Sequence, residues 1–174
     1  MEGILAALAV LGSALGSHGE GAPSQDVSIS VQGRVERQCG IGPGGLIDLG
    51  HLTGRRVEAS ARFDLYCNTP FDLRIVAERG ALEHARTPEG SGPYAGRIAY
   101  DLDLTIPLRT ASGAGELHAN FRGRELAGEG RTLRSGAGVA AAGGRIEVSM
   151  RAGAETHLAG DYQEAVLIRI SPIQ

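Results

Sequence analysis

The 174-residue chain is long enough for one domain with a hydrophobic core and, once a targeting segment is removed, too short for two of ordinary size. Its 27 glycines and 7 prolines predict many turns between short strands rather than long helices. The formal charge is -3, and the 17 basic residues, all arginine, are spread along the chain without a dense cluster. This distribution argues against a nucleic-acid-binding groove, and the absence of lysine excludes a Walker-A lysine and a Schiff base.

The N-terminus has the pattern of an export segment. An apolar run from Ile4 to Leu15 precedes small and polar residues, and a run of this length matches the hydrophobic region of a signal peptide while being too short to span a bilayer. The alternative is a buried N-terminal helix, but no polar face accompanies the apolar one. We expect residues 1–22 to be a signal peptide, cut after Gly16 or Ala22, and residues 23–174 to form a single domain without a membrane span.

Cys39 and Cys67 are the only cysteines of the chain. In an exported protein such an even pair predicts a disulfide, and closing the loop between them contributes about 3.5 kcal/mol in the chain-entropy treatment. A zinc site would need closely spaced cysteine or histidine ligands, and neither cysteine has a histidine within several residues.

The first half of the mature chain alternates between apolar and polar residues. Residues 27–39 alternate strictly, which predicts a half-buried strand or two strands in tandem. The clearest strand covers residues 57–67, and residues 71–75 alternate in the same way after an Asn-Thr-Pro turn. These two segments predict a hairpin with Cys67 at its corner.

In the second half, residues 80–96 are rich in glycine and proline and are expected to form a loop. Strands are predicted over residues 98–106, 146–151 and 162–170, with a weaker one near 117–121. Pro107 is expected to end its strand or to mark an edge strand. No stretch of the sequence outside the export segment repeats its apolar residues with a helical period. Short strands at this spacing therefore predict an antiparallel sandwich. The inward-facing positions are Phe63, Leu65, Leu73, Ile75, Tyr100, Leu102, Val148 and Ile168.

The chain contains no motif that predicts catalysis. His51, His84, His118 and His157 are far apart in sequence and are interpreted as isolated surface residues rather than metal ligands. Asp101 and Asp103 share one face of a strand, which alternation identifies as the solvent face. We therefore expect no enzyme activity, no cofactor and no metal.

Five segments carry a resemblance to a known family. They are the strand ending at Cys39, Leu46–Gly50, Cys67–Phe71, Ile98–Leu102 and Leu158–Val166, the last with Glu164 in an acidic position that follows a tyrosine. In this order and spacing they resemble the spore coat protein U domain family, whose members are similar to the pilins of archaic chaperone-usher systems. The match covers nearly the whole mature chain.

The resemblance implies an all-β, immunoglobulin-like sandwich of the pilin type that lacks its last strand and carries one disulfide. A groove would then lie open between the sheet edges, to be filled first by a periplasmic chaperone and later by the N-terminal extension of the next subunit. The implied partners are further copies of the chain, the chaperone and an outer-membrane usher, with transit through the periplasm to the cell surface.

Two alternatives remain open at the level of sequence. Val27, Ile29 and Val31 either form the donor strand that enters the neighbouring subunit or are simply the start of the strand that ends at Cys39. The protein is either a structural subunit of a surface pilus or coat, or a secreted or tip-located binding module that recognises carbohydrate or host protein. Exposed aromatic residues for sugar stacking are scarce, which favours the structural subunit.

Overall fold

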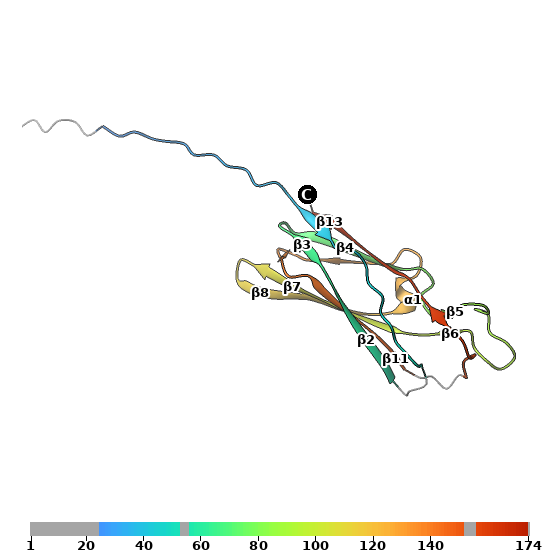
Figure 1. Cartoon of the computed structure of the whole chain (residues 1–174). Coiled ribbons are helices and arrows are strands. Elements are labelled where there is room, and N and C mark those ends of the chain that lie inside the picture. The colour runs from blue at the N-terminus through green and yellow to red at the C-terminus, as the bar shows by residue number, and fades with distance from the viewer. Residues whose placement is uncertain (1–24, 53–55, 152–155, 174) are drawn as a thin grey trace, which may run out of the picture. The chain divides into compact units, whose positions relative to one another are not determined.

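The computed structural model describes residues 25–52, 56–151 and 156–173 (Figure 1). The predicted signal peptide lies outside the described residues. The chain divides into two units, Met1–Arg34 and Val35–Gln174. The described part of the first unit, residues 25–34, is exposed and contains no helix or strand. All described helices and strands belong to the second unit, which we call the body.

The larger sheet of the body is antiparallel throughout. Its strand order is β1 (Cys39–Ile41), β3 (Leu65–Cys67), β10 (Val139–Ala140), β7 (Asp101–Thr110), β11 (Gly144–Arg151) and β2 (Arg56–Phe63), with β8 (Gly113–Arg122) also paired to β7. The predicted strand over residues 57–67 is thus present as β2 and β3, separated by one residue. Within the described strands, β2 pairs only with β11 and lies at an edge.

The second sheet is smaller and also antiparallel. Its order is β13 (Val166–Pro172), β4 (Phe71–Ala77) and β9 (Arg131–Arg134), so that β13 and β9 are its edges. A third set of short strands lies at one end of the body and consists of β12 (Tyr162–Gln163), β5 (Leu82–His84) and β6 (Arg97–Ile98). The only described helix is α1 (Gly123–Leu126), a single turn.

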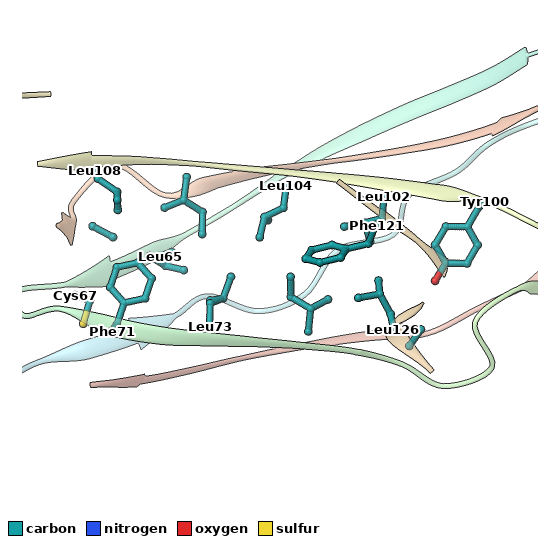
Figure 2. Close-up of a cluster of buried hydrophobic side chains, with 14 of the residues drawn as sticks. Leu65, Cys67, Phe71, Leu73, Tyr100, Leu102, Leu104, Leu108, Phe121 and Leu126 are labelled. Atoms are coloured by element: carbon teal, nitrogen blue, oxygen red, sulfur yellow. The ribbon is translucent and has the colours of Figure 1, made fainter. Parts of the chain in front are cut away.

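The hydrophobic core lies between the two main sheets, as an immunoglobulin-like β-sandwich requires. Figure 2 shows Leu104 and Leu108 of β7 pointing toward Phe71 and Leu73 of β4. Of the predicted inward positions, five are buried: Leu65, Leu73, Ile75, Tyr100 and Leu102. Phe63 and Ile168 are half-buried, and the side chain of Val148 lies outside the described residues.

Two predictions from alternation are wrong. Residues 25–38 form no strand, and the first strand of the described chain begins only at Cys39. The predicted hairpin is also absent, because β3 pairs with β1 and β10 whereas β4 pairs with β13 and β9. The chain crosses from one sheet to the other at residues 68–70. Alternation identifies a strand and its apolar face, but it does not identify the strand's neighbours.

Pro107 neither ends a strand nor marks an edge. β7 continues to Thr110 and is paired on both sides. Proline is tolerated here because the ladder to β10 covers only residues 108 and 109 of β7 and the ladder to β11 stops at residue 105. Pro107 therefore faces an interruption where its missing N–H has no partner strand to bond.

Candidate functional site

An apolar groove of about 430 Å³ lies between the edges of the two main sheets. One wall is the start of β13, including Val166 and Ile168. The other is formed by Phe63 of β2, by Ile41 at the end of β1 and by the irregular segment that follows β1 as far as Leu49. Its floor is formed by the buried side chains of Leu82, Tyr100 and Leu102 and by the half-buried side chain of Ile146. The wall side chains Phe63, Val166 and Ile168 are only half-buried, so the sandwich is incompletely covered along this line.

Strand β13 is incompletely covered on the groove side. Within the described residues it pairs only with β4, so the backbone groups of its other edge form no ladder with a strand. Its inward side chains Val166, Ile168 and Ile170 are half-buried, whereas the inward side chains of neighbouring β4 are fully buried. An apolar edge strand of this kind is a site where another strand can pair.

Two polar residues mark the end of the groove nearest the start of β13. The Glu164 carboxylate accepts hydrogen bonds from the backbone N–H groups of Arg79 at 3.1 Å, Ala81 at 3.0 Å and Ala165 at 2.7 Å, and so fixes the loop after β4 to this end of β13. The Tyr100 hydroxyl is buried and has no hydrogen-bond partner among the described residues. Burial, and secondarily the Glu164 carboxylate, raise the pKa of Tyr100 above its ordinary value.

The disulfide between Cys39 and Cys67 is present, as the sequence predicts. The two cysteines lie directly opposite each other in the β1–β3 ladder, and Cys67 is fully buried. The bond thereby fastens β1 to β3 close to the start of the body.

The proposed donor residues are not part of the body. Val27, Ile29 and Val31 are 85%, 80% and 90% exposed. Their alternation is therefore not explained by packing against the described residues of the chain. An apolar face without a covering surface is the feature expected of a segment that packs against a partner.

The histidines do not form a common site. His84 is buried in β5, contrary to the prediction of a surface residue, and its Nδ1 accepts hydrogen bonds from the backbone N–H groups of Arg86 and Thr87. His118 is exposed and lies 3.1 Å from the Asp103 carboxylate on the outer face of the larger sheet. Within the part of the chain that the structure describes, no group of three or more potential ligands could hold a metal ion.

Sequence reasoning missed most of the groove-lining residues. The resemblance implied a groove between sheet edges, but Tyr100 was predicted only as a core position of its strand. Leu82 was expected in a loop over residues 80–96, whereas the structure places it in β5. The acidic place of Glu164 was noted in the sequence, whereas its hydrogen bonds to the loop after β4 depend on the fold. None of the described helices is long and apolar enough to cross a membrane.

No protein-family model and no curated protein match the chain. Among solved structures, the chain is similar to one in a structure described as "Chaperone-tip adhesin complex is vital for synergistic activation of CFA/I fimbriae biogenesis", with 14% identity and a TM-score of 0.45. The likeness covers 79% of this chain and 42% of that chain, so the protein spans less than half the length of its match. A likeness at this level assigns neither a family nor a function.

Proposed function

We propose that the protein is a structural subunit of a bacterial surface fibre or coat, in which the N-terminal extension of one copy fills the groove of the next. The observation that supports this most directly is the apolar groove beside the unpaired edge of β13, in a chain that also has an exposed alternating segment. Strand addition joins two such features, because backbone hydrogen bonds hold the strand and alternate side chains fill the groove.

The energies indicate why both parts of the interaction are needed. Burying three Val or Ile side chains contributes roughly 4 to 9 kcal/mol, at about 1.5 to 3 kcal/mol each. Association costs about 4 to 15 kcal/mol, which offsets most or all of this gain, so the side chains alone give little net binding. The free edge of β13 supplies the additional interactions, since an incoming strand can form a hydrogen-bonded ladder along it.

The proposal includes further partners. An open apolar groove is an aggregation hazard before assembly, so a periplasmic chaperone would supply a temporary strand and an outer-membrane usher would receive the complex. The subunit would pass through the periplasm and reside at the cell surface. The sequence resemblance to the spore coat protein U domain family supports the same assignment.

The test is a pair of aspartate substitutions in neighbouring positions of the extension. Ile29→Asp places a charge on the inward face, and burial of that charge without a counter-ion costs several kcal/mol. Ser28→Asp adds the same charge on the opposite face of an extended segment and is the matched control. Each full-length variant is compared with wild type for SDS-resistant polymer ladders and for the amount of soluble subunit.

We expect Ile29→Asp to abolish the ladders while soluble subunit accumulates, and Ser28→Asp to retain them. Normal ladders from Ile29→Asp would contradict the donor assignment. Loss of soluble subunit as well would show that the segment contributes to its own domain. Absence of ladders from wild type would favour the alternative of a monomeric binding module.

A further inference from the structure

Asn68 extends the β1–β3 ladder past the point where β3 ends. The Gln38 N–H donates to Asn68 Oδ1 at 2.8 Å, and the Asn68 N–H donates to the Gln38 carbonyl at 3.0 Å. The Asn68 Nδ2 amide donates in turn to the carbonyl of Glu36 at 2.8 Å. One side-chain amide thus supplies the acceptor and the donor that two successive backbone groups of a continuing strand would provide.

The local sequence explains why a side chain is needed here. After Cys67 the chain turns into the second sheet through residues 68–70, and Pro70 has no N–H to offer to a neighbouring strand. Without the Asn68 side chain, the Gln38 N–H and the Glu36 carbonyl would lose their partner, and only the backbone bond from the N–H of residue 68 to the Gln38 carbonyl would remain. Together with the disulfide one residue further on, Asn68 holds the base of the extension in line with β1.

The same turn lies beside the C-terminal end of β13. Pro172 of β13 is paired with Phe71, and the Ile173 N–H donates to the Pro70 carbonyl at 2.9 Å. Residues 36–38 therefore join β1 at the end of the body toward which β13 runs. An extension that folded back into its own groove would lie parallel to β13, whereas one from another copy can enter antiparallel.

The antiparallel arrangement is the one that this fold uses. Every ladder between the described strands is antiparallel, and parallel pairing is slightly less stable per residue. Self-insertion nevertheless has an advantage of proximity. A tethered segment has an effective concentration on the order of millimolar, roughly a thousandfold above micromolar free subunits. A subunit that polymerises through its own N-terminus therefore needs a feature that opposes self-closure.

We propose that Asn68 is this feature: it is a positioning residue that fixes residues 36–38 in line with β1, and so directs the extension to a second copy rather than back into its own groove. Fold-back would require a reversal of the chain within residues 36–38, which would break the hydrogen bonds to Gln38 and Glu36. This inference rests on the proposed function.

The experiment compares full-length Asn68→Ala and Asn68→Asp with wild type. Alanine removes both side-chain bonds, whereas aspartate keeps an acceptor for the Gln38 N–H and loses the donor to the Glu36 carbonyl. Asn120→Ala is the matched control, because Asn120 also makes a side-chain hydrogen bond, to Asp103 at 2.8 Å on the outer face of β8. The readouts are the ratio of polymer to monomer and the hydrogen exchange of the Gln38 amide and of residues 25–33.

For Asn68→Ala we expect faster hydrogen exchange of the Gln38 amide and at least a tenfold decrease in the ratio of polymer to monomer. In that monomer, residues 25–33 should be protected from exchange, because they have entered the groove of their own copy. Adding Ile29→Asp to this variant should remove the protection. Asn68→Asp should give exchange rates and a polymer-to-monomer ratio between those of Asn68→Ala and wild type. It also provides the test if the alanine variant does not fold. Asn120→Ala should match wild type.

Two failures can be distinguished. If wild type forms polymers and Asn68→Ala forms as many despite faster exchange at Gln38, the role of Asn68 in partner choice is refuted while the proposed function stands. If wild type forms no polymers, the proposed function itself fails and this inference fails with it. A monomer of Asn68→Ala with unprotected residues 25–33 would also refute self-closure.

Discussion

Phe63 offers a direct test of whether a strand occupies the groove. Its ring forms part of the groove wall, is half-buried, and lies so close to Gly144 that a Cβ at that glycine would overlap it. Phe71 is the same residue type on the opposite sheet and is fully buried. The two phenylalanines therefore differ in burial while the deleted atoms in a Phe→Ala change are identical.

The expected costs follow from this difference. Phe71→Ala should reduce the free energy of unfolding by about 3 to 5 kcal/mol, the usual range for a fully buried ring. Phe63→Ala should cost about half as much, roughly 2 kcal/mol, while the groove is empty. When a strand covers the groove the Phe63 ring becomes buried, and its truncation should then approach the cost of Phe71→Ala.

The assay is urea unfolding of both variants and wild type, with and without a synthetic peptide of residues 25–35. With peptide present, we expect Phe63→Ala to lower the free energy of unfolding by about 1.5 kcal/mol more than it does without peptide. This difference corresponds to roughly tenfold weaker binding of the peptide to the variant. The cost of Phe71→Ala should not depend on the peptide. If the peptide stabilises wild type and the cost of Phe63→Ala is unchanged, the peptide binds elsewhere and the groove assignment is refuted.

The remaining predictions concern Tyr100, in the floor of the groove, and the disulfide. Tyr100→Phe should be neutral or stabilising at pH 7, since a buried hydroxyl without a partner costs about 1 to 3 kcal/mol; a loss above about 1 kcal/mol would mean that the hydroxyl is hydrogen-bonded. The pKa of Tyr100 in the folded protein lies above the unfolded value of about 10, so its contribution to the free energy of unfolding is complete below pH 10 and is lost as the pH rises above 10. The midpoint of unfolding should therefore fall at alkaline pH in wild type and fall less in Tyr100→Phe. No lysine contributes to this fall, because the chain has none. Mass spectrometry without reductant should find Cys39 and Cys67 two hydrogens lighter than the dithiol, and reduction should lower stability by about 3.5 kcal/mol; free thiols in the isolated protein would contradict the bond.

The sequence by itself determined much of the strand content. Alternation located β2 with β3, β4, β7, β11 and β13, because a strand with one face in the core must repeat its apolar residues at every second position. The cysteine count predicted the disulfide. The pattern failed where apolar residues are few: β8 was expected to be a short, weak strand and extends over ten residues, and β9 was not expected.

Pairing and the groove were decided only by the tertiary structure. The period of a strand is a local property, whereas its neighbours depend on how the sheets stack, so residues 57–75 gave two correct strands and an incorrect hairpin. The same distinction applies to the extension, whose alternation is as regular as that of β2 but which has no partner in the described chain. The groove exists because β2 and β13 are both edges of their sheets, and edge positions follow from the complete strand order, which no single segment of sequence contains.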